Sequence, residues 1–440
     1  MPIFSDIVDQ DYRDEPYWWR HARPFDPGNA ELPGKIDVAV IGSGYAGLRC
    51  AIELARAGRS VVVLDALQIG EGASTRAAGL VSGRAGVSKQ INLVRAVGEQ
   101  RATAILDEAD TAFEDFRDFI GENDIDCDFE PVGRFVGANT SKAYAKLAEK
   151  TAEYNSDGKE RFRMVEQADQ SEYVKSDFFK GGMLTLDAGS IHSSKYHAGL
   201  VRVCLNLGVR LVGNTRVTGI VASGAQKTIE TSRGKLQAGE VMMGTGGYTD
   251  GLSTWHQRRI IPMSSTIIAT QNLGRDRVRE LLPAGMPVID TKRVICFARP
   301  SPDGAHILFG GRARFTPISA ERSVEILYDQ MLEVFPELEG ARVINSWSGF
   351  MAFTFDFLPK IGRHEDIHYA MACNGGSGIV MMSWLGKKAA GNILGLTEQK
   401  SAFEGLDFKT KPMYSGKPWF LPVVGNWYRF RDWLDRCLDS

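Results

Sequence analysis

The sequence has few of the features that mark secreted or membrane-spanning proteins. It has six cysteines in 440 residues, and none forms a Cys-x-x-Cys pair; this wide scatter indicates reduced thiols in a cytosolic protein. No stretch reaches the roughly 18 uncharged apolar residues of a membrane span. Acidic residues stand near the N-terminus, where a signal peptide needs a basic start and an apolar run. We therefore expect a cytoplasmic protein without a transmembrane segment.

Excess charge of either sign is also missing. Lys and Arg number 52 and Asp and Glu number 54, which gives a formal net charge of −2. This balance gives no electrostatic reason to expect nucleic acid as a partner. Hydrophobic residues make up 43% and charged residues 24%, as in ordinary globular proteins. The length predicts two or three domains.

The first informative pattern begins at Ile36. A buried-strand run (36–41) is followed by a glycine-rich turn, a helix (45–57) and a second strand (60–64), which together predict a βαβ unit with a parallel sheet. The turn reads Gly42-Ser43-Gly44-Tyr45-Ala46-Gly47, and Asp65 ends the second strand. Such a turn brings backbone and helix N-terminus to a pyrophosphate, and the acid accepts hydrogen bonds from ribose hydroxyls. The segment predicts a dinucleotide site, for NAD or FAD.

A second small-residue loop favours FAD. Residues 70–79 read GEGASTRAAG and follow the second strand closely. Their backbone N–H groups and the Arg76 cation suit a phosphate or a flavin ring, whereas an NAD enzyme has no evident need for this loop.

The remaining pattern alternates between two kinds of region. An amphipathic helix (101–121), a helix (195–206), a β-meander (217–247), a strand-rich stretch (258–315) and two further helices (322–335 and 378–394) are expected from periodicity. We expect an N-terminal arm (1–35), a discontinuous cofactor domain (36–90, 191–257 and 325–395), a substrate domain (91–190 and 258–324) and a C-terminal aromatic segment (396–440).

Taken together, these motifs resemble the D-amino-acid oxidase-like superfamily, in particular its γ-glutamylputrescine oxidase branch and the related sarcosine and glycine oxidases. The resemblance runs from about Tyr17 to Trp433. The blocks that carry it are IGSGYAGL, GEGASTRAAG, LDAGSIHSSKY, VMMGTGGYT, RPSPDGAHILFGG, WSGFMAFTFDFLPKIG and NGGSGIVMMSWLG. It implies an α/β (α+β) fold, in which an FAD-binding Rossmann-like domain of the GR2 type is interleaved with a substrate domain built on a mixed β-sheet.

The resemblance also implies which residues hold FAD. The ADP half would contact Gly42, Ser43, Gly44, Tyr45, Ala46, Gly47, Asp65, Ala66, Thr245 and Gly246, with the backbone of Val217 at the adenine. The pyrophosphate and the flavin edge would follow Gly72, Ala73, Ser74, Thr75, Arg76, Ala78, Gly79 and Leu80. The pyrimidine end of the flavin would lie beside Asn374, Gly376, Ser377, Gly378 and Ile379.

At several positions the sequence differs from the relatives in residues that concern flavin attachment and oxygen activation. Residues 345–362 contain no cysteine and residues 66–90 no histidine, the residues through which relatives attach flavin, so we expect non-covalent FAD. The oxygen-activating lysine of sarcosine oxidases is replaced by Leu308. The electron acceptor is therefore O2 or another molecule.

The substrate residues are harder to assign. We consider Arg299 as a carboxylate clamp, Trp347 as a pocket wall or plain core, and Tyr248 beside the cofactor. Arg134 follows a predicted domain switch and is equally compatible with a surface ion pair. His192 and His197 lack a third ligand for a metal, so no metal site is expected. The C-terminal run 418–438 is aromatic and basic on one side, which is compatible with a membrane surface. We favour docking on the body as short helical pieces broken by prolines and a glycine.

The function implied is FAD-dependent oxidation of a C–N bond in an amine, an N-substituted amino acid or a γ-glutamyl-amine-like substrate. A hydride would pass to flavin N5 and the resulting imine would hydrolyse; no catalytic side chain is nominated. The alternatives are an FAD-dependent dehydrogenase of a D-amino acid or 2-hydroxy acid, an NAD-dependent dehydrogenase, and a non-catalytic flavin-binding subunit.

Overall fold

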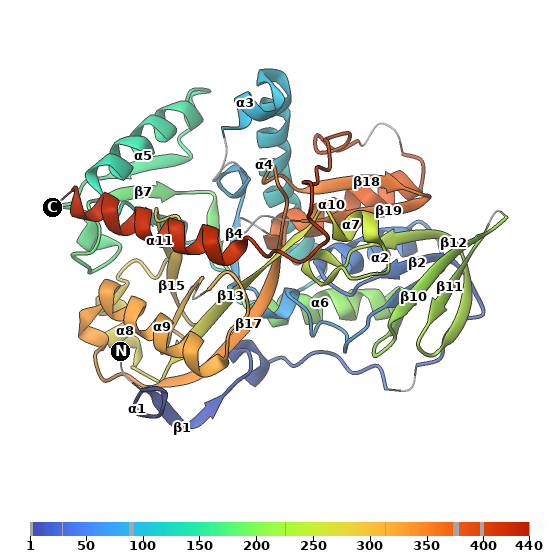
Figure 1. The fold of residues 1–440 in the computed structure, drawn as a ribbon, viewed down its shortest axis with the longest axis horizontal. Coiled ribbons are helices and arrows are strands. Elements are labelled where there is room, and N and C mark those ends of the chain that lie inside the picture. Colours follow the sequence, from blue (N-terminus) through green and yellow to red (C-terminus); the bar gives the residue numbers. More distant parts are fainter. Residues whose placement is uncertain are drawn as a thin grey trace.

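The computed structural model describes residues 3–28, 30–87, 92–224, 226–312, 314–372, 378–396 and 400–439. Within these residues the strands form two large sheets and one small ribbon (Figure 1). The eleven helices described are α1 (Phe4–Ile7), α2 (Tyr45–Arg56), α3 (Leu93–Val97), α4 (Glu99–Glu122), α5 (Ser141–Tyr154), α6 (Ser193–Asn206), α7 (Thr254–Gln257), α8 (Arg275–Leu281), α9 (Ala320–Val334), α10 (Gly378–Ile393) and α11 (Leu421–Cys437).

The eight-stranded sheet, as described, contains the predicted βαβ unit. Its spatial order is β10 (Val217–Ser223), β11 (Gln226–Thr231), β12 (Gly234–Met243), β2 (Lys35–Ile41), β3 (Val61–Leu64) and β9 (Arg210–Val212), with β19 (Ile367–Met371) beside β12 and β18 (Lys360–His364) beside β19. β2 runs parallel to both β3 and β12. The strand, helix and strand predicted from residue 36 onward are therefore confirmed, as is the meander.

The centre of this sheet is buried on both faces, as expected of parallel strands. Val38 and Val40 of β2 pack in one core with α2, α4, α6 and α10, and Ala39 and Ile41 pack in another with the meander strands. Because successive side chains alternate between faces, the apolar run of β2 supplies both cores. The C-terminal ends of β2 and β3 lie side by side in the sheet, and small and polar residues follow both strands there.

The nine-stranded sheet, again within the described residues, is mixed. Its spatial order is β1 (Val8–Arg13), β17 (Val343–Phe353), β13 (Ile261–Thr270), β16 (Ile307–Gly311), β15 (Cys296–Pro300), β14 (Val288–Asp290), β5 (Arg134–Gly137), β7 (Gly182–Thr185) and β6 (Phe162–Val165). Helices α8 and α9 share its main apolar core. The chain enters this sheet in several separate passages, so the two sheets are interleaved in sequence.

The glycine-containing block around Trp347 belongs to this second sheet. β17 pairs along its length with β13 in an antiparallel register that includes Ile267 opposite Trp347. We expected residues 325–395 to lie with the cofactor region, but α9 and β17 pack with the nine-stranded sheet. The chain returns to the eight-stranded sheet at β18.

The C-terminal segment is a correction to the sequence prediction. Prolines and a glycine were expected to break it, yet α11 is one continuous helix of 17 residues. Pro422 lies in its first turn, where a missing N–H costs nothing. Gly425 faces the ring of Phe315, where an added Cβ would lie 2.6 Å from the ring. The glycine thus allows close docking and does not end the helix.

No helix among the described residues has both the length and the apolar character needed to cross a bilayer.

Candidate active site

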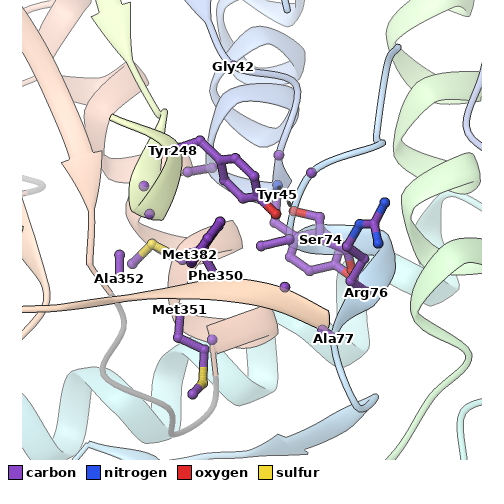
Figure 2. A pocket seen from close by; sticks show the side chains of 18 of the residues that line it. Gly42, Tyr45, Ser74, Arg76, Ala77, Tyr248, Phe350, Met351, Ala352 and Met382 are labelled. Atoms are coloured by element: carbon purple, nitrogen blue, oxygen red, sulfur yellow. Dashed lines mark hydrogen bonds between the residues drawn. The ribbon is translucent and has the colours of Figure 1, made fainter. Parts of the chain in front are cut away.

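One large cavity, of about 710 Å³, lies where the two sheets meet. Residues from the ends of β2, β3 and β12 line it together with residues from β5, β13, β16 and β17. Its volume is in the range of small-molecule and cofactor sites. Figure 2 shows the part of its wall formed by Tyr45, Ser74, Arg76, Tyr248 and Phe350.

The glycine turn after β2 is built for close approach. Gly42 has a φ of +101° and Gly47 lies so near the turn that an added Cβ would be 1.9 Å from the Gly42 carbonyl oxygen. The helix α2 begins at Tyr45 after Gly44, a residue that has no side chain to cap this end. The partial positive charge and free N–H groups of a helix N-terminus therefore face the cavity, which suits a pyrophosphate.

Asp65 stands beside this turn at the end of β3. Its Oδ2 accepts hydrogen bonds from the Ser43 N–H at 2.8 Å and the Ser43 hydroxyl at 2.6 Å, and its Oδ1 accepts from the Leu67 N–H at 3.0 Å. Burial raises the pKa of the Asp65 carboxyl, and these hydrogen bonds oppose the rise. A carboxylate has about four acceptor positions, so capacity remains for a ribose hydroxyl in the cavity that it lines.

The second small-residue loop closes over the start of α2. The Ser74 hydroxyl accepts from the Tyr45 N–H at 3.1 Å, and the Ser74 carbonyl accepts from the Tyr45 hydroxyl at 2.6 Å. The Arg76 guanidinium donates to the carbonyls of Glu71 and Ser348 and lies 4.7 Å from the Trp19 ring. The loop is thereby fixed to both sheets, with small side chains toward the cavity.

Most residues predicted to hold FAD converge on this cavity. Those that line it are Gly42, Ser43, Gly44, Tyr45, Ala46, Asp65, Ala66, Gly72, Ala73, Ser74, Arg76, Ala78, Gly79, Leu80, Val217, Thr245, Gly246, Gly378 and Ile379. Gly47 and Thr75 stand behind the wall; the Thr75 hydroxyl donates to the Gly70 carbonyl at 2.6 Å. Asn374, Gly376 and Ser377 lie outside the described residues.

The group that these residues fit is a long dinucleotide. The N-terminus of α2 and an acid mark one part of the cavity, and a wall of Ile267, Phe350, Met351 and Met382 marks another. The Tyr248 and Phe350 rings pack edge to face at 5.6 Å. One end therefore suits phosphate and ribose, and the other suits a flat apolar ring, as FAD requires.

Two arginines line the part of the cavity formed by the nine-stranded sheet: Arg134, which the sequence offered either as a substrate residue or as a surface ion pair, and Arg312, which the sequence analysis did not single out. Arg134 in β5 and Arg312 after β16 are buried lining residues. Burial lowers the pKa of each to about 10. Neither side chain has an ion-pair partner among the described residues. The Arg312 guanidinium donates to the Arg293 carbonyl at 3.3 Å, and the buried Arg134 Nε has no hydrogen-bond partner there. A buried cation without a counter-ion is costly, so this arrangement favours an anionic ligand.

Arg299 is placed differently from our prediction. Its guanidinium donates to the carbonyls of Ala78, Gly79 and Ile191, at 3.2, 3.2 and 2.7 Å, and it does not line the cavity. The Arg299 side chain therefore holds the end of the second small-residue loop in place, and the donors that it uses there are not available to a substrate carboxylate.

Trp347 and the two histidines also support the wall from behind. The Trp347 ring is buried away from the cavity and donates to the Arg76 carbonyl at 2.9 Å. His192 caps α6 by accepting from the Lys195 N–H, and His197 contacts the Ser43 carbonyl at 2.7 Å. Among the described residues no group of three His, Cys, Asp or Glu side chains is placed to hold a metal ion.

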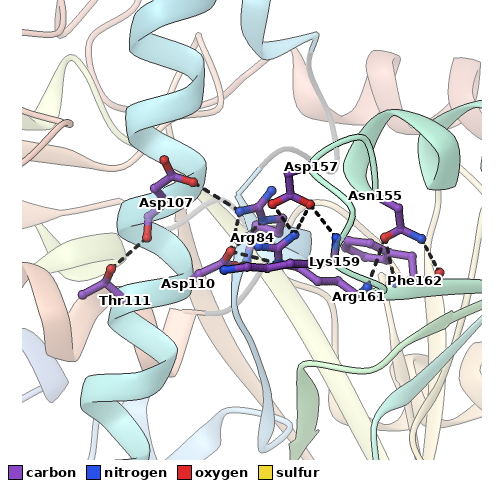
Figure 3. Close-up of polar contacts among 9 residues, drawn as sticks. All are labelled: Arg84, Asp107, Asp110, Thr111, Asn155, Asp157, Lys159, Arg161 and Phe162. Carbon is purple, nitrogen blue, oxygen red and sulfur yellow. Dashed lines mark hydrogen bonds and ion pairs between the residues drawn. The ribbon is translucent and has the colours of Figure 1, made fainter.

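An ion-pair network fixes another stretch of wall. Ala85 and Gly86 line the cavity, and the neighbouring Arg84 donates to Asp110 of α4 at 2.7 Å. Arg161, which precedes β6, approaches the same carboxylate at 3.5 Å (Figure 3). The network therefore ties α4 to the nine-stranded sheet beside the cavity.

The fold and this cavity define a class: an oxidoreductase scaffold that holds a dinucleotide cofactor against a second, substrate-facing sheet. Within that class, the chain belongs to the DAO family, FAD dependent oxidoreductase, whose family model matches residues 37–391. FAD is its cofactor. The resemblance inferred from the motifs is confirmed.

Similar proteins agree with this assignment. The chain is 28% identical over 387 residues to "Probable oxidoreductase OrdL" of Haemophilus influenzae, covering 87% of this chain and 88% of that one. It is also 28% identical over 385 residues to "Gamma-glutamylputrescine oxidoreductase" of Escherichia coli, covering 87% and 89%. The crystal structure of glycine oxidase from Geobacillus kaustophilus superposes with a TM-score of 0.70 at 20% identity, covering 86% and 99%. The predicted fold class is thereby confirmed.

Proposed function

We propose that this protein oxidises a C–N bond of an amine or amino-acid substrate that carries an anionic group. The observation that carries the proposal is the cavity in which the dinucleotide turn meets two buried arginines that have no ion-pair partner in the described part of the chain. Relatives named γ-glutamylputrescine oxidoreductase and glycine oxidase act on substrates of this chemistry by their names. The non-covalent attachment of FAD is part of the proposal.

The roles of the residues follow from their positions. Arg134 and Arg312 would bind the anionic group of the substrate through charge-assisted hydrogen bonds. The wall that includes Ile289, Ile295 and Phe297 would exclude water from the reacting carbon. When bound, FAD supplies the acceptor for the hydride that leaves the carbon beside nitrogen. The imine that results would hydrolyse to a carbonyl compound and an amine.

The proposal needs no protein base if the substrate amine binds in its neutral form. The phenol of Tyr248 lines the cavity, and burial raises its pKa, so it stays protonated at neutral pH. We assign it a positioning part in the wall beside Phe350.

The test is anaerobic reduction of the purified protein. The visible spectrum should show bound flavin, and acid precipitation should release the flavin into the supernatant if it is non-covalent. Amines and N-substituted amino acids that carry a carboxylate should bleach the flavin without oxygen, whereas matched amines without a carboxylate should bleach it far more slowly. Admission of air then reports whether O2 reoxidises the flavin.

Failure of all amines to bleach a flavin-loaded protein would reject the proposal. Bleaching by 2-hydroxy acids alone would favour the dehydrogenase alternative. Bleaching by neutral amines and carboxylated amines at equal rates would remove the assigned role of the two arginines.

A further inference from the structure

The outer face of α11 is an exposed aromatic ridge. Its side chains keep much of their surface in solvent: Val423 70%, Trp427 54%, Phe430 48% and Trp433 59%, with Trp419 65% just before the helix and Leu438 77% just after it. The spacing of three and four residues places them along one face. Neighbouring rings touch, with centroids of Trp427, Phe430 and Trp433 each 5.9 Å from the next.

The opposite face holds α11 firmly on the body. The Asp432 carboxylate is buried and accepts hydrogen bonds from the N–H groups of Arg293 and Val294, at 3.1 and 3.0 Å. Gly425 packs on Phe315, and Leu421 is buried. The ridge is therefore presented by a docked helix, so the aromatic side chains are not exposed through fraying.

The chain that leads into the ridge is basic, whereas its C-terminal end carries Asp432, Asp435 and Asp439 beside Arg436. Residues 408–431 contain five lysines and arginines and no aspartate or glutamate, although the whole protein has a net charge of −2. Lys409, Lys411 and Lys417 are exposed. The Arg431 guanidinium lies 5.8 Å from the Trp427 ring. An aromatic ridge preceded by an exposed cationic segment thus lies on a molecule that is nearly neutral overall.

We propose that α11 and the preceding segment 409–419 bind the surface of an anionic lipid bilayer, with the helix lying in the plane of the interface. Trp side chains favour the headgroup level of a membrane, and basic residues nearby are attracted to anionic lipids. The structure favours a membrane over a second copy of the chain. Four half-exposed aromatic side chains offer on the order of 400 Å² of apolar surface, whereas a stable protein interface buries about 800 Å² per partner.

Membrane binding would orient the cavity. The Arg429 guanidinium donates to the Arg312 carbonyl at 3.4 Å, and Asp432 holds the chain just before Ile295. Arg312 and Ile295 both line the cavity. The docked helix would therefore bring the arginine-bearing end of the cavity close to the bilayer.

The test is co-sedimentation of the full-length, FAD-loaded protein with vesicles of phosphatidylcholine alone or with one-fifth phosphatidylglycerol. We expect binding to the anionic vesicles that weakens as salt is raised, because surface charges are screened. The triple variant W427S/F430S/W433S should lower the partition coefficient at least about tenfold, since it removes most of the insertable apolar surface. K409Q/K411Q/K417Q should lower it by about fivefold per lysine.

The matched control is Val221→Ser, which removes an equally exposed apolar side chain (53%) on β10, at the far end of the molecule from α11 (Figure 1). It should bind vesicles as the unchanged protein does. The flavin spectrum and thermal unfolding of each variant establish that it is folded.

Three outcomes would overturn the proposal. These are no sedimentation with anionic vesicles at low salt, equal sedimentation of the aromatic triple variant, or a dimer in analytical ultracentrifugation that the triple variant dissociates while no vesicles are bound. None of these outcomes affects the flavin reaction, so this proposal and the proposed function fail separately.

Discussion

At the scale of single residues, the most specific prediction concerns Arg134. It is buried in the cavity wall without an ion-pair partner among the described residues, so it destabilises the folded state unless a ligand is bound. Arg134→Met should therefore leave the apparent Tm unchanged or raise it. The same variant should weaken binding of a carboxylated substrate by about 10- to 100-fold, the value of a charge-assisted hydrogen bond.

The measurement is a titration of flavin bleaching with a carboxylated amine and its uncharged analogue. Arg134→Lys keeps the charge but loses the planar fork and should fall between the other two proteins. A Met variant that unfolds at a markedly lower temperature and binds substrate normally would show that Arg134 is structural.

His197 gives a prediction for pH dependence. Burial lowers its pKa to about 4, from an ordinary value of 6.5. The folded protein therefore binds fewer protons than the unfolded chain between these values, so stability is complete above pH 6.5 and is lost as pH falls toward 4. At pH 5 this histidine alone should cost about 2 kcal/mol.

The variant His197→Gln keeps a donor for the Ser43 carbonyl but cannot titrate. Its apparent Tm should fall less between pH 7 and 5 than that of the unchanged protein. Other buried histidines, His192 and His256 among them, also have lowered pKa values and contribute equally to both proteins. Parallel pH curves for the two proteins would contradict the assignment.

The arginines also show what could and could not be predicted at this scale. Arg299 and Arg134 both stand in strands, and either was compatible with a carboxylate clamp. The side chain of Arg299 turns to the loop carbonyls of Ala78 and Gly79, whereas the Arg134 Nε meets no acceptor among the residues that the structure describes. That difference depends on which distant segments the two strands lie against, and local sequence does not encode those neighbours.

At the scale of elements, Asp110 of α4 joins two buried arginines. Arg84 and Arg161 are each 8% exposed, and both reach the Asp110 carboxylate (Figure 3). Asp110→Ala leaves two buried cations with a reduced set of partners and should lower the free energy of unfolding by about 3 kcal/mol. For a chain of this length that is about 3 °C in Tm.

Asp107→Asn is the matched control, because this neighbour pairs with Arg84 at 3.3 Å but its side chain is 66% exposed; such a pair is worth less than about 1 kcal/mol. Because Ala85 and Gly86 follow Arg84 in the cavity wall, Asp110→Ala should also weaken FAD binding. Equal Tm values for the two variants would contradict this account of the network.

Hydrophobic periodicity predicted helices and strands well in segments where a helical or a strand pattern was clear. The alternation of faces in β2 and the apolar stripe of α4 were visible in the sequence, and both elements form as expected. The prediction that α11 would be broken into short pieces was wrong, because the positions of its proline and glycine within the helix were not considered. Pro422 is harmless in a first turn, and the role of Gly425 depends on Phe315, which lies far away in sequence.

At the scale of the whole molecule, interleaving could be predicted because nucleotide-type motifs recur between segments of another character. The sheet to which each individual strand belongs could not be predicted. β17 lies within residues 325–395, which we expected in the cofactor domain, yet it pairs with β13 in the nine-stranded sheet. Sheet pairing is decided by long-range register, and the single sequence contains no direct record of it.

Because both sheets line the cavity, FAD should stabilise both together. At a free FAD concentration 100 times its Kd, linkage adds about 2.7 kcal/mol to the free energy of unfolding, or about 3 °C in Tm for a chain of this length. The apoprotein should lose hydrogen-exchange protection in the eight-stranded sheet and also in β17, where Gly349, Phe350 and Met351 contribute to the wall.

Hydrogen exchange measured with and without FAD distinguishes this from independent halves. A cofactor that contacts both sheets couples their local unfolding, because either sheet must release the cofactor before it can unfold freely. Protection gained only in β2, β3 and β12 would mean that FAD contacts one sheet alone, and the substrate-facing wall would then have to form without it. Strand β6, which lies at the edge of the nine-stranded sheet and is absent from the cavity wall, should change least and provides the internal reference for this comparison.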